Sequence, residues 1–322
     1  RLGQHRRYQR HRQRAQHSAP RIERRRPVNA VAASPLRGIF WMLAAMSLLV
    51  LSNGTTKWFS ADYSPGQVVF IRSLFVLLFL IPVVWRHGGW RSLRVASWRN
   101  QGLRAVFHTL TALFIVSSVI LLPLADAEAL LFAAILFIAI LSGPVLGEKV
   151  GWRRMMAVAI GFIGVIVMLR PTPELIKPAA LVGVCAALFT ALRDLWSRKL
   201  AGTETTNAMM ICSEAGLLLA SGLTVFAFWS PLVWQPLDAR DLFLMALNGL
   251  VFGAAQYALL LAYRHGNAAA VAPFRYSAAI WAVVFGYAMF GELPDGFVIA
   301  GAAIVIASGL YILHREAGGQ RT

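Results

Sequence analysis

The chain has 322 residues, of which 58% are hydrophobic and 14% are charged, and its mean hydropathy is +0.61. Soluble domains carry about 25% charged residues, so this composition excludes a water-soluble globular protein. The formal net charge is +17, and residues 1–37 alone hold eleven arginines and one glutamate.

The basic N-terminal segment has none of the patterns of a nucleic-acid-binding module. Residues 1–35 lack apolar periodicity, interleaved aromatic residues and metal-ligand spacing. We therefore expect a disordered tail and no nucleic-acid partner. Such a tail can contact the anionic lipids of a bilayer.

Ten apolar segments follow, each close to the roughly 20 residues that a membrane-spanning helix needs. The sequence therefore predicts an all-α membrane protein with ten transmembrane helices. Pro123 supports the break between the third and fourth segments, because proline ends or kinks a helix. The predicted segments are 36–58, 64–85, 99–120, 124–146, 151–169, 178–199, 207–229, 239–262, 268–290 and 295–314.

Basic residues are distributed unequally between the two sets of predicted loops. If both termini are cytoplasmic, twelve Lys and Arg residues in the loops and C-terminal tail face the cytoplasm and three face the other side. The positive-inside rule therefore predicts cytoplasmic termini in a multi-pass protein of the inner (plasma) membrane. In this orientation residues 1–35 and 315–322 are cytoplasmic tails.

Two stretches of the chain resemble each other, and they predict an internal repeat. Residues 124–170 and 266–313 each contain an apolar run, a Gly-Glu pair and a second apolar run rich in Gly and Ala. The matched pairs, 144 residues apart, are Gly147-Glu148 and Gly291-Glu292. We interpret both glutamates as helix-end caps, because a carboxylate suits the N-terminus of the next helix.

Extended over the chain, this similarity predicts two five-helix units, residues 36–170 and 178–314. Because five is an odd number, the second unit starts from the opposite side of the membrane, so the two repeats are inverted. Inverted repeats place a binding site between the two units near the middle of the bilayer, and they permit alternating access.

Short motifs occur in the same order in both units. In the first unit they are VVFIRSLFVLLFL (68–80), Arg104, LPLADAEALLF (122–132), LGEKVGWRR (146–154) and GFIGVIVMLRP (161–171). In the second they are AALFTALRDLWSRKL (186–200) and APFRYSAAIWAVVFGYAMFGELPD (272–295). Together they resemble the EamA-like family of the drug/metabolite transporter superfamily, over about residues 36–314.

This resemblance implies a ten-helix, inverted-repeat secondary transporter in an inner membrane. It also implies a cavity lined mainly by the first, third, fourth, sixth, eighth and ninth segments. The family often has a proline in the fourth segment about where Ile135 stands, so any kink there must have another origin. The resemblance implies a class of mechanism and no particular substrate.

Charged residues inside the predicted helices are the main functional candidates, because a charge at the bilayer centre costs about 2.5–3.5 kcal/mol on insertion scales. Depth along the helices permits Arg72 to pair with Asp126 or Glu128. Such pairs form structural clamps, gates or substrate contacts. The candidates for coupling or gating are Arg72, Asp126, Glu128, Arg193, Asp194 and Glu214.

Arg275 is the strongest candidate for a substrate anchor, and depth also permits Glu214 to pair with Arg275 or Arg193. It lies beside Tyr276 and Pro273, where an aromatic ring can stack on a planar solute and proline frees a carbonyl. Arginine suits a carboxylate or phosphate on the solute. The full set of predicted substrate-binding residues is Arg275, Tyr276, Asn53, His108, Asn248, Gln256 and Tyr257.

Packing is an alternative explanation for the uncharged polar residues of this set, since hydrogen bonds between membrane helices average only about 0.6 kcal/mol. His108 is a candidate proton relay, because its pKa is ordinarily near neutrality. The spacing Gly249-x-x-x-Gly253 predicts close packing of the eighth segment against a neighbouring helix.

The leading hypothesis is a secondary transporter of a small polar or amphipathic organic metabolite. The alternatives are a lipid-linked flippase and a non-transporting scaffold or sensor. We predict no enzymatic activity, catalytic residue, cofactor or metal site, because the chain lacks H-E-x-x-H, G-x-S-x-G and Gly-rich phosphate-loop motifs. The sequence leaves proton coupling and a homodimer open.

Overall fold

A computed structural model of the protein describes residues 35–86, 88–147, 151–169, 178–200, 203–226, 234–265 and 271–319. Nearly all of the predicted N-terminal tail lies outside the described residues, as does Glu148. The described residues form helices and no strands, which confirms an all-α protein. The elements are α2 (Pro35–Phe59), α3 (Pro65–Arg86), η1 (Gly89–Leu93), α4 (Trp98–Leu121), α5 (Leu124–Leu131), α6 (Ala133–Leu146), α7 (Trp152–Leu169), α8 (Pro178–Leu200), α9 (Thr206–Phe226), α10 (Ala239–His265), η2 (Ala272–Ser277), α12 (Ala278–Phe290) and α13 (Gly296–Gly319).

Seven stretches of helix are long and apolar enough to cross a membrane, counting α5 and α6 as one. Shorter apolar helices lie at 155–168 and 296–312. With η2 and α12, these elements follow the order of the ten predicted segments. The last helix continues to Gly319, so the predicted tail at 315–322 is helical over its described part.

The fourth and ninth predicted segments are each interrupted. The fourth breaks at Phe132, whose N–H donates to the Ala129 carbonyl 3.2 Å away, three residues back instead of four. The tightened turn at Phe132 therefore provides the break that a proline near Ile135 often supplies in the family. The ninth starts as the 3-10 helix η2, which has a proline in its first turn, and becomes α-helical at Ala278.

Both glycines of the repeated Gly-Glu pairs end a helix in the left-handed region. Gly147 ends α6 with a φ of 73°, and Gly291 ends α12 with a φ of 66°. This conformation is the usual helix C-cap and strains any residue with a Cβ, which explains why glycine occupies both positions.

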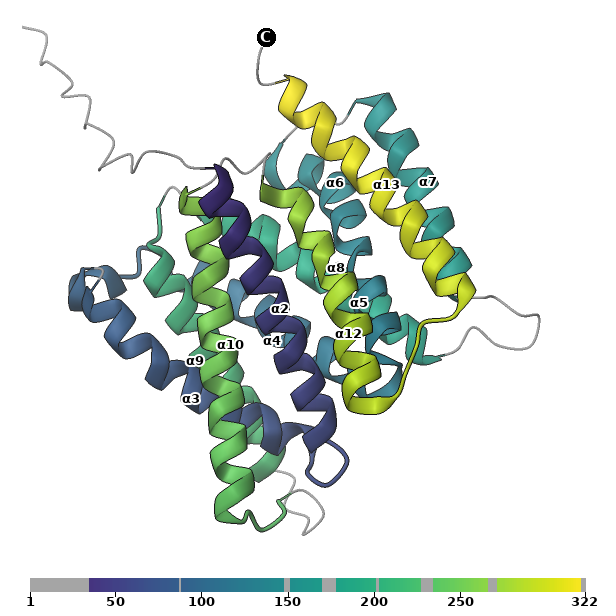
Figure 1. The fold of residues 1–322 in the computed structure, drawn as a ribbon. Coiled ribbons are helices and arrows are strands. Elements are labelled where there is room, and N and C mark those ends of the chain that lie inside the picture. Colours follow the sequence, from purple (N-terminus) through teal and green to yellow (C-terminus); the bar gives the residue numbers. More distant parts are fainter. Residues whose placement is uncertain are drawn as a thin grey trace, which may run out of the picture. The chain divides into compact units, whose positions relative to one another are not determined.

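The helices pack in a limited set of pairs (Figure 1). In Figure 1, α2 lies beside α10, and α7 lies beside α13 at the edge of the bundle. In addition, α4 contacts α8 and α9, and α3 contacts α9 and α10. Among the interrupted segments, α5 and α6 pack on α8, while η2 and α12 pack on α2.

Large apolar side chains are exposed on the outer surfaces of several helices. Ile160, Ile163 and Ile166 follow one face of α7, and Leu219 and Leu223 follow one face of α9. An exposed apolar surface of this extent is expected where lipid covers the protein. The fold is therefore that of a multi-pass membrane protein.

Candidate functional site

A cavity of about 160 Å³ lies between helices from the first half of the chain, residues 36–170, and helices from the second half, residues 178–314. Its walls come from the first, third, fourth, sixth, eighth and ninth predicted segments, as the family resemblance implies. Arg72 of α3 and Leu217 of α9 complete the lining. Pockets for drug-sized ligands usually measure about 300–1,000 Å³, so a solute of that size needs a wider cavity.

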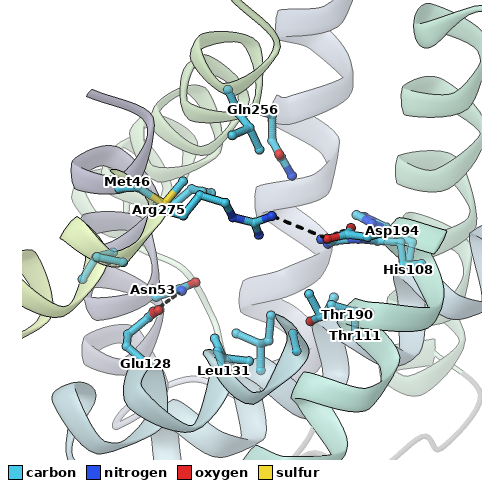
Figure 2. Close-up of a pocket in the computed structure, with 18 of the residues that line it drawn as sticks. Met46, Asn53, His108, Thr111, Glu128, Leu131, Thr190, Asp194, Gln256 and Arg275 are labelled. Atoms are coloured by element: carbon cyan, nitrogen blue, oxygen red, sulfur yellow. Dashed lines mark hydrogen bonds and ion pairs between the residues drawn. The ribbon is translucent and has the colours of Figure 1, made fainter. Parts of the chain in front are cut away.

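Eight of the thirteen predicted site residues line this cavity, and most of them are labelled in Figure 2. The eight are Asn53, Arg72, His108, Glu128, Arg193, Asp194, Gln256 and Arg275. The other five predicted residues, which are not among the lining residues, are Asp126, Glu214, Asn248, Tyr257 and Tyr276.

Asp194 lies between two arginines on one side of the cavity. Its neighbour Arg193 donates from Nε and Nη2 to Oδ1 at 3.0 and 2.8 Å. Arg275 extends across the cavity from η2, and its Nη1 lies 3.8 Å from Asp194 Oδ2 (Figure 2). The prediction that Glu214 pairs with Arg275 or Arg193 is therefore wrong, since Asp194 holds both arginines.

Glu128 is buried on α5, and its partner is an amide. Asn53 Nδ2 on α2 donates to Glu128 Oε1 at 2.7 Å, and both side chains line the cavity (Figure 2). The contact ties the first predicted segment to the fourth. The predicted pair between Arg72 and Glu128 is not formed.

Arg72 is 3% exposed on α3, and its described partners are an aromatic ring and a hydroxyl. Its guanidinium carbon lies 4.5 Å from the centre of the Phe252 ring, and Nη1 donates to Thr56 Oγ1 at 3.4 Å. Asn248 also donates to that oxygen at 3.2 Å and accepts from Ser52 at 2.6 Å. Asn248 therefore joins α10 to α2 and is not among the residues that line the cavity.

His108 connects the cavity to a carboxylate behind it. Its Nε2 lies 3.2 Å from Glu214 Oε1, and both residues are buried. Depth along the helices did not identify this histidine on α4 as the partner of Glu214.

Tyr276 does not accompany Arg275 into the cavity. It is 7% exposed and packs edge-to-face on Phe132, with ring centres 5.2 Å apart. A Cβ on Gly309 of α13 would lie 1.7 Å from the Tyr276 hydroxyl, so that glycine makes room for it. Tyr257 lines a separate hollow next to η1 and the start of α9.

A second charged contact lies where α2 and α12 end and α5 begins. The sequence interpretation did not predict it. Lys57 Nζ lies 2.7 and 2.8 Å from the two carboxylate oxygens of Glu292, and it donates to the Leu122 carbonyl at 2.9 Å. The Leu124 N–H donates to Glu292 at 3.0 Å. Glu292 therefore caps α5 as well as pairing with a lysine, whereas the sequence suggested a cap for α13.

Comparison with known proteins identifies the class of this chain. Residues 36–170 match the EamA-like transporter family. The riboflavin transporter of Rhizobium johnstonii is 30% identical over 304 residues, covering 91% of this chain and 97% of the relative. The S-adenosylmethionine uptake transporter of Rickettsia prowazekii is 26% identical over 293 residues, covering 90% and 96%.

A solved crystal structure of a protein shares the fold, with a TM-score of 0.59, 19% identity, and coverage of 89% of this chain and 98% of that one. The chain is thus a membrane transporter and not an enzyme. It belongs to the EamA-like transporter family. This membership does not favour the flippase or the scaffold.

Proposed function

We propose that the protein is a secondary transporter that moves a small polar or amphipathic organic metabolite by alternating access. The observation that carries this proposal is a cavity lined by charged and polar as well as apolar side chains, whose walls come from both predicted five-helix units. Rocking of one unit against the other would open such a cavity to each side in turn. The small volume of the cavity agrees with a state in which neither opening is wide.

Two features of the packing support an inverted repeat. If the first five segments are exchanged with the second five, the pair α2–α10 becomes α8–α4, and the pair α3–α10 becomes α9–α4; all four pairs are in contact. In addition, Phe132 and Tyr276 are 144 residues apart, the spacing of the repeat, and their rings touch. Residues related by a twofold axis meet each other only close to that axis.

We place both termini in the cytoplasm and the protein in an inner membrane. The twelve-to-three bias of basic residues supports the orientation, and the bacterial origin of the relatives supports the membrane. A cysteine-labelling experiment tests the topology. A membrane-impermeant thiol reagent should label an introduced cysteine at Ser60 in intact cells, and one at Ser92 only after lysis.

Arg275 is the proposed contact through which solute bound in the cavity triggers movement of the helices. Its 3.8 Å separation from Asp194 is longer than a hydrogen bond, so an acceptor group on the solute can take the place of that carboxylate. Replacement would release α8 from η2 and link binding to movement. Arg275→Ala should insert normally and lose transport.

Glu128 is the proposed proton-coupling group. It is 5% exposed, lines the cavity and has a neutral hydrogen-bond partner, so loss or gain of its proton changes the charge of the cavity directly. Purified protein in liposomes should accumulate solute in response to a pH gradient. Glu128→Gln should retain downhill flux but lose this accumulation, whereas accumulation that survives collapse of the gradient would show that coupling is absent.

A further inference from the structure

The charges that line the cavity are neutralised unequally. Asp194 holds both Arg193 and Arg275, while Glu128 accepts a hydrogen bond from Asn53. Arg72 forms no ion pair within the described part of the chain. The charge of Glu214 acts on Arg72 only at longer range, and that carboxylate already contacts His108.

The surroundings of Arg72 leave its N–H groups available. A guanidinium has five N–H donors, and the contacts in the described residues use one of them, at 3.4 Å. Phe252 covers one face of the guanidinium. The edge of the group, where the donors lie, is therefore the part that can recognise a ligand.

Close helix packing holds this arginine in position. A Cβ on Gly249 of α10 would lie 2.7 Å from the Arg72 carbonyl oxygen and 2.7 Å from the Phe75 Cβ. The glycine therefore lets α10 approach α3 and brings Phe252, three residues further along α10, onto the guanidinium. A side chain with one face covered and a fixed backbone loses little freedom when it binds a ligand.

A second unsatisfied polar group lines the same cavity. Thr111 of α4 is 1% exposed, and its hydroxyl has no hydrogen-bond partner among the described residues. A buried polar atom without a partner is unfavourable, so unsatisfied groups that face a cavity mark places where a ligand completes the hydrogen bonding.

We propose that the Arg72 guanidinium binds an anionic group, a carboxylate or a phosphate, of the transported metabolite. The inference rests on the proposed transport function and adds the chemical class of the solute. A guanidinium binds either anion through two parallel hydrogen bonds, a geometry that an ammonium group does not offer. The solute anion then provides the counter-charge that this part of the cavity lacks.

The experiment uses the whole protein in liposomes and a defined mixture of matched metabolites. Each carboxylate in the mixture is paired with its primary amide, and each phosphate monoester with its alcohol; the contents of the liposomes are measured by mass spectrometry. The wild-type protein should take up anionic members and prefer each to its neutral partner by about 10- to 100-fold. Uptake of neutral members alone, or of both members equally, would overturn the anion site but leave the transport function standing.

Variants test the assignment to Arg72. Arg72→Gln should reduce uptake of the anionic member by about 10- to 100-fold through a higher KM, and Arg72→Lys should recover part of the loss. Arg104→Gln is the matched control, since Arg104 lies outside the cavity and bonds Ser197, Ser213 and the Met209 carbonyl. Unchanged anion selectivity in folded Arg72→Gln would refute the proposal.

The inference can also be tested without any variant, in case the Arg72 substitutions prevent insertion. In the wild-type protein, the amide or alcohol of an accumulated anion should inhibit its uptake about tenfold more weakly than the unlabelled anion does. Equal inhibition would contradict the anion site. A wild-type protein that accumulates nothing would contradict the transport function itself, which is a different result.

Discussion

The two sides of the cavity contain the same residue type in different electrostatic settings. On the α8–η2 side, Arg193 and Arg275 share the carboxylate of Asp194. On the α3–α10 side, Arg72 lies under Phe252 without an ion-pair partner in the described residues. The neighbours of an arginine, more than its depth in the membrane, therefore determine whether it can serve as a gate or as a ligand-binding group.

Replacing each of the two arginines with glutamine should reveal the largest difference between the two sides of the cavity. We expect Arg72→Gln to reduce uptake of an anionic solute by about 10- to 100-fold, because the solute loses a charged bidentate partner. Arg275→Gln should raise the KM less, since Arg275 already has a carboxylate to exchange, and should mainly lower the maximal rate, in keeping with the loss of transport expected for Arg275→Ala. Initial uptake rates over a range of solute concentrations provide the measurement, and equal rises in KM would contradict the difference between the two sides.

Disturbing the helix packing beneath Arg72 should have the next largest effect. Gly249→Ala places a methyl group against the backbone of α3, and we expect it to destabilise the protein by about 1–3 kcal/mol. Gly102→Ala on α4 is the matched control, because a Cβ there meets nothing within 4 Å. This control should be neutral or up to about 1 kcal/mol more stable, since alanine favours helix. Unfolding in detergent measures both, and equal stability of the two variants would argue against close α3–α10 packing.

The ion pair on the α8–η2 side should contribute less to stability. Side chains of Arg275 and Asp194 are 33% and 25% exposed, and their charged atoms are 3.8 Å apart. A double-mutant cycle with Asp194→Asn and Arg275→Gln should therefore yield a coupling energy of about 0.5–1 kcal/mol. A coupling energy of several kcal/mol would instead indicate a rigid clamp, which does not suit a contact that must open.

Removal of the Tyr276 hydroxyl should have the smallest effect on transport. Tyr276 packs on Phe132 and faces α13 at Gly309, so Tyr276→Phe should leave uptake within about twofold of the wild type. Measuring the KM of Arg275→Gln in parallel distinguishes the role of Arg275 in solute binding from that of Tyr276. A large rise in KM for Tyr276→Phe would restore the sequence-based view that Arg275 and Tyr276 bind solute together.

Much of the fold could be predicted from the sequence, because bilayer thickness determines how many apolar residues a spanning helix needs. The order of the ten segments was anticipated on this basis, and the family resemblance implied most of the segments that surround the cavity. The interruption at Phe132 was not, since that residue carries no breaking signal of its own. It becomes apparent only in the structure, where the ninth predicted segment is also interrupted, at η2.

The candidate site was predictable only in part. Charged and polar residues in apolar helices identified eight lining residues, including Arg72, Glu128 and Arg275. Their partners were not predictable, because depth along a helix specifies one coordinate and leaves the rotation and the neighbouring helix undefined. For this reason the contacts of Glu214 with His108 and of Glu128 with Asn53 were found only in the structure. Thr111 was missed because threonine is unremarkable in an apolar helix.

By itself, the sequence determined the class of this protein: a membrane transporter of the EamA-like type whose helices carry a few buried charges. Composition indicated a membrane protein, because it reflects the lipid environment, and the resemblance of the ordered motifs indicated the family. Only the tertiary structure decided which charges neutralise one another. That outcome depends on contacts of a few ångströms between helices far apart in the chain. Within the described residues, these contacts leave Arg72 as a cavity arginine without an ion-pair partner.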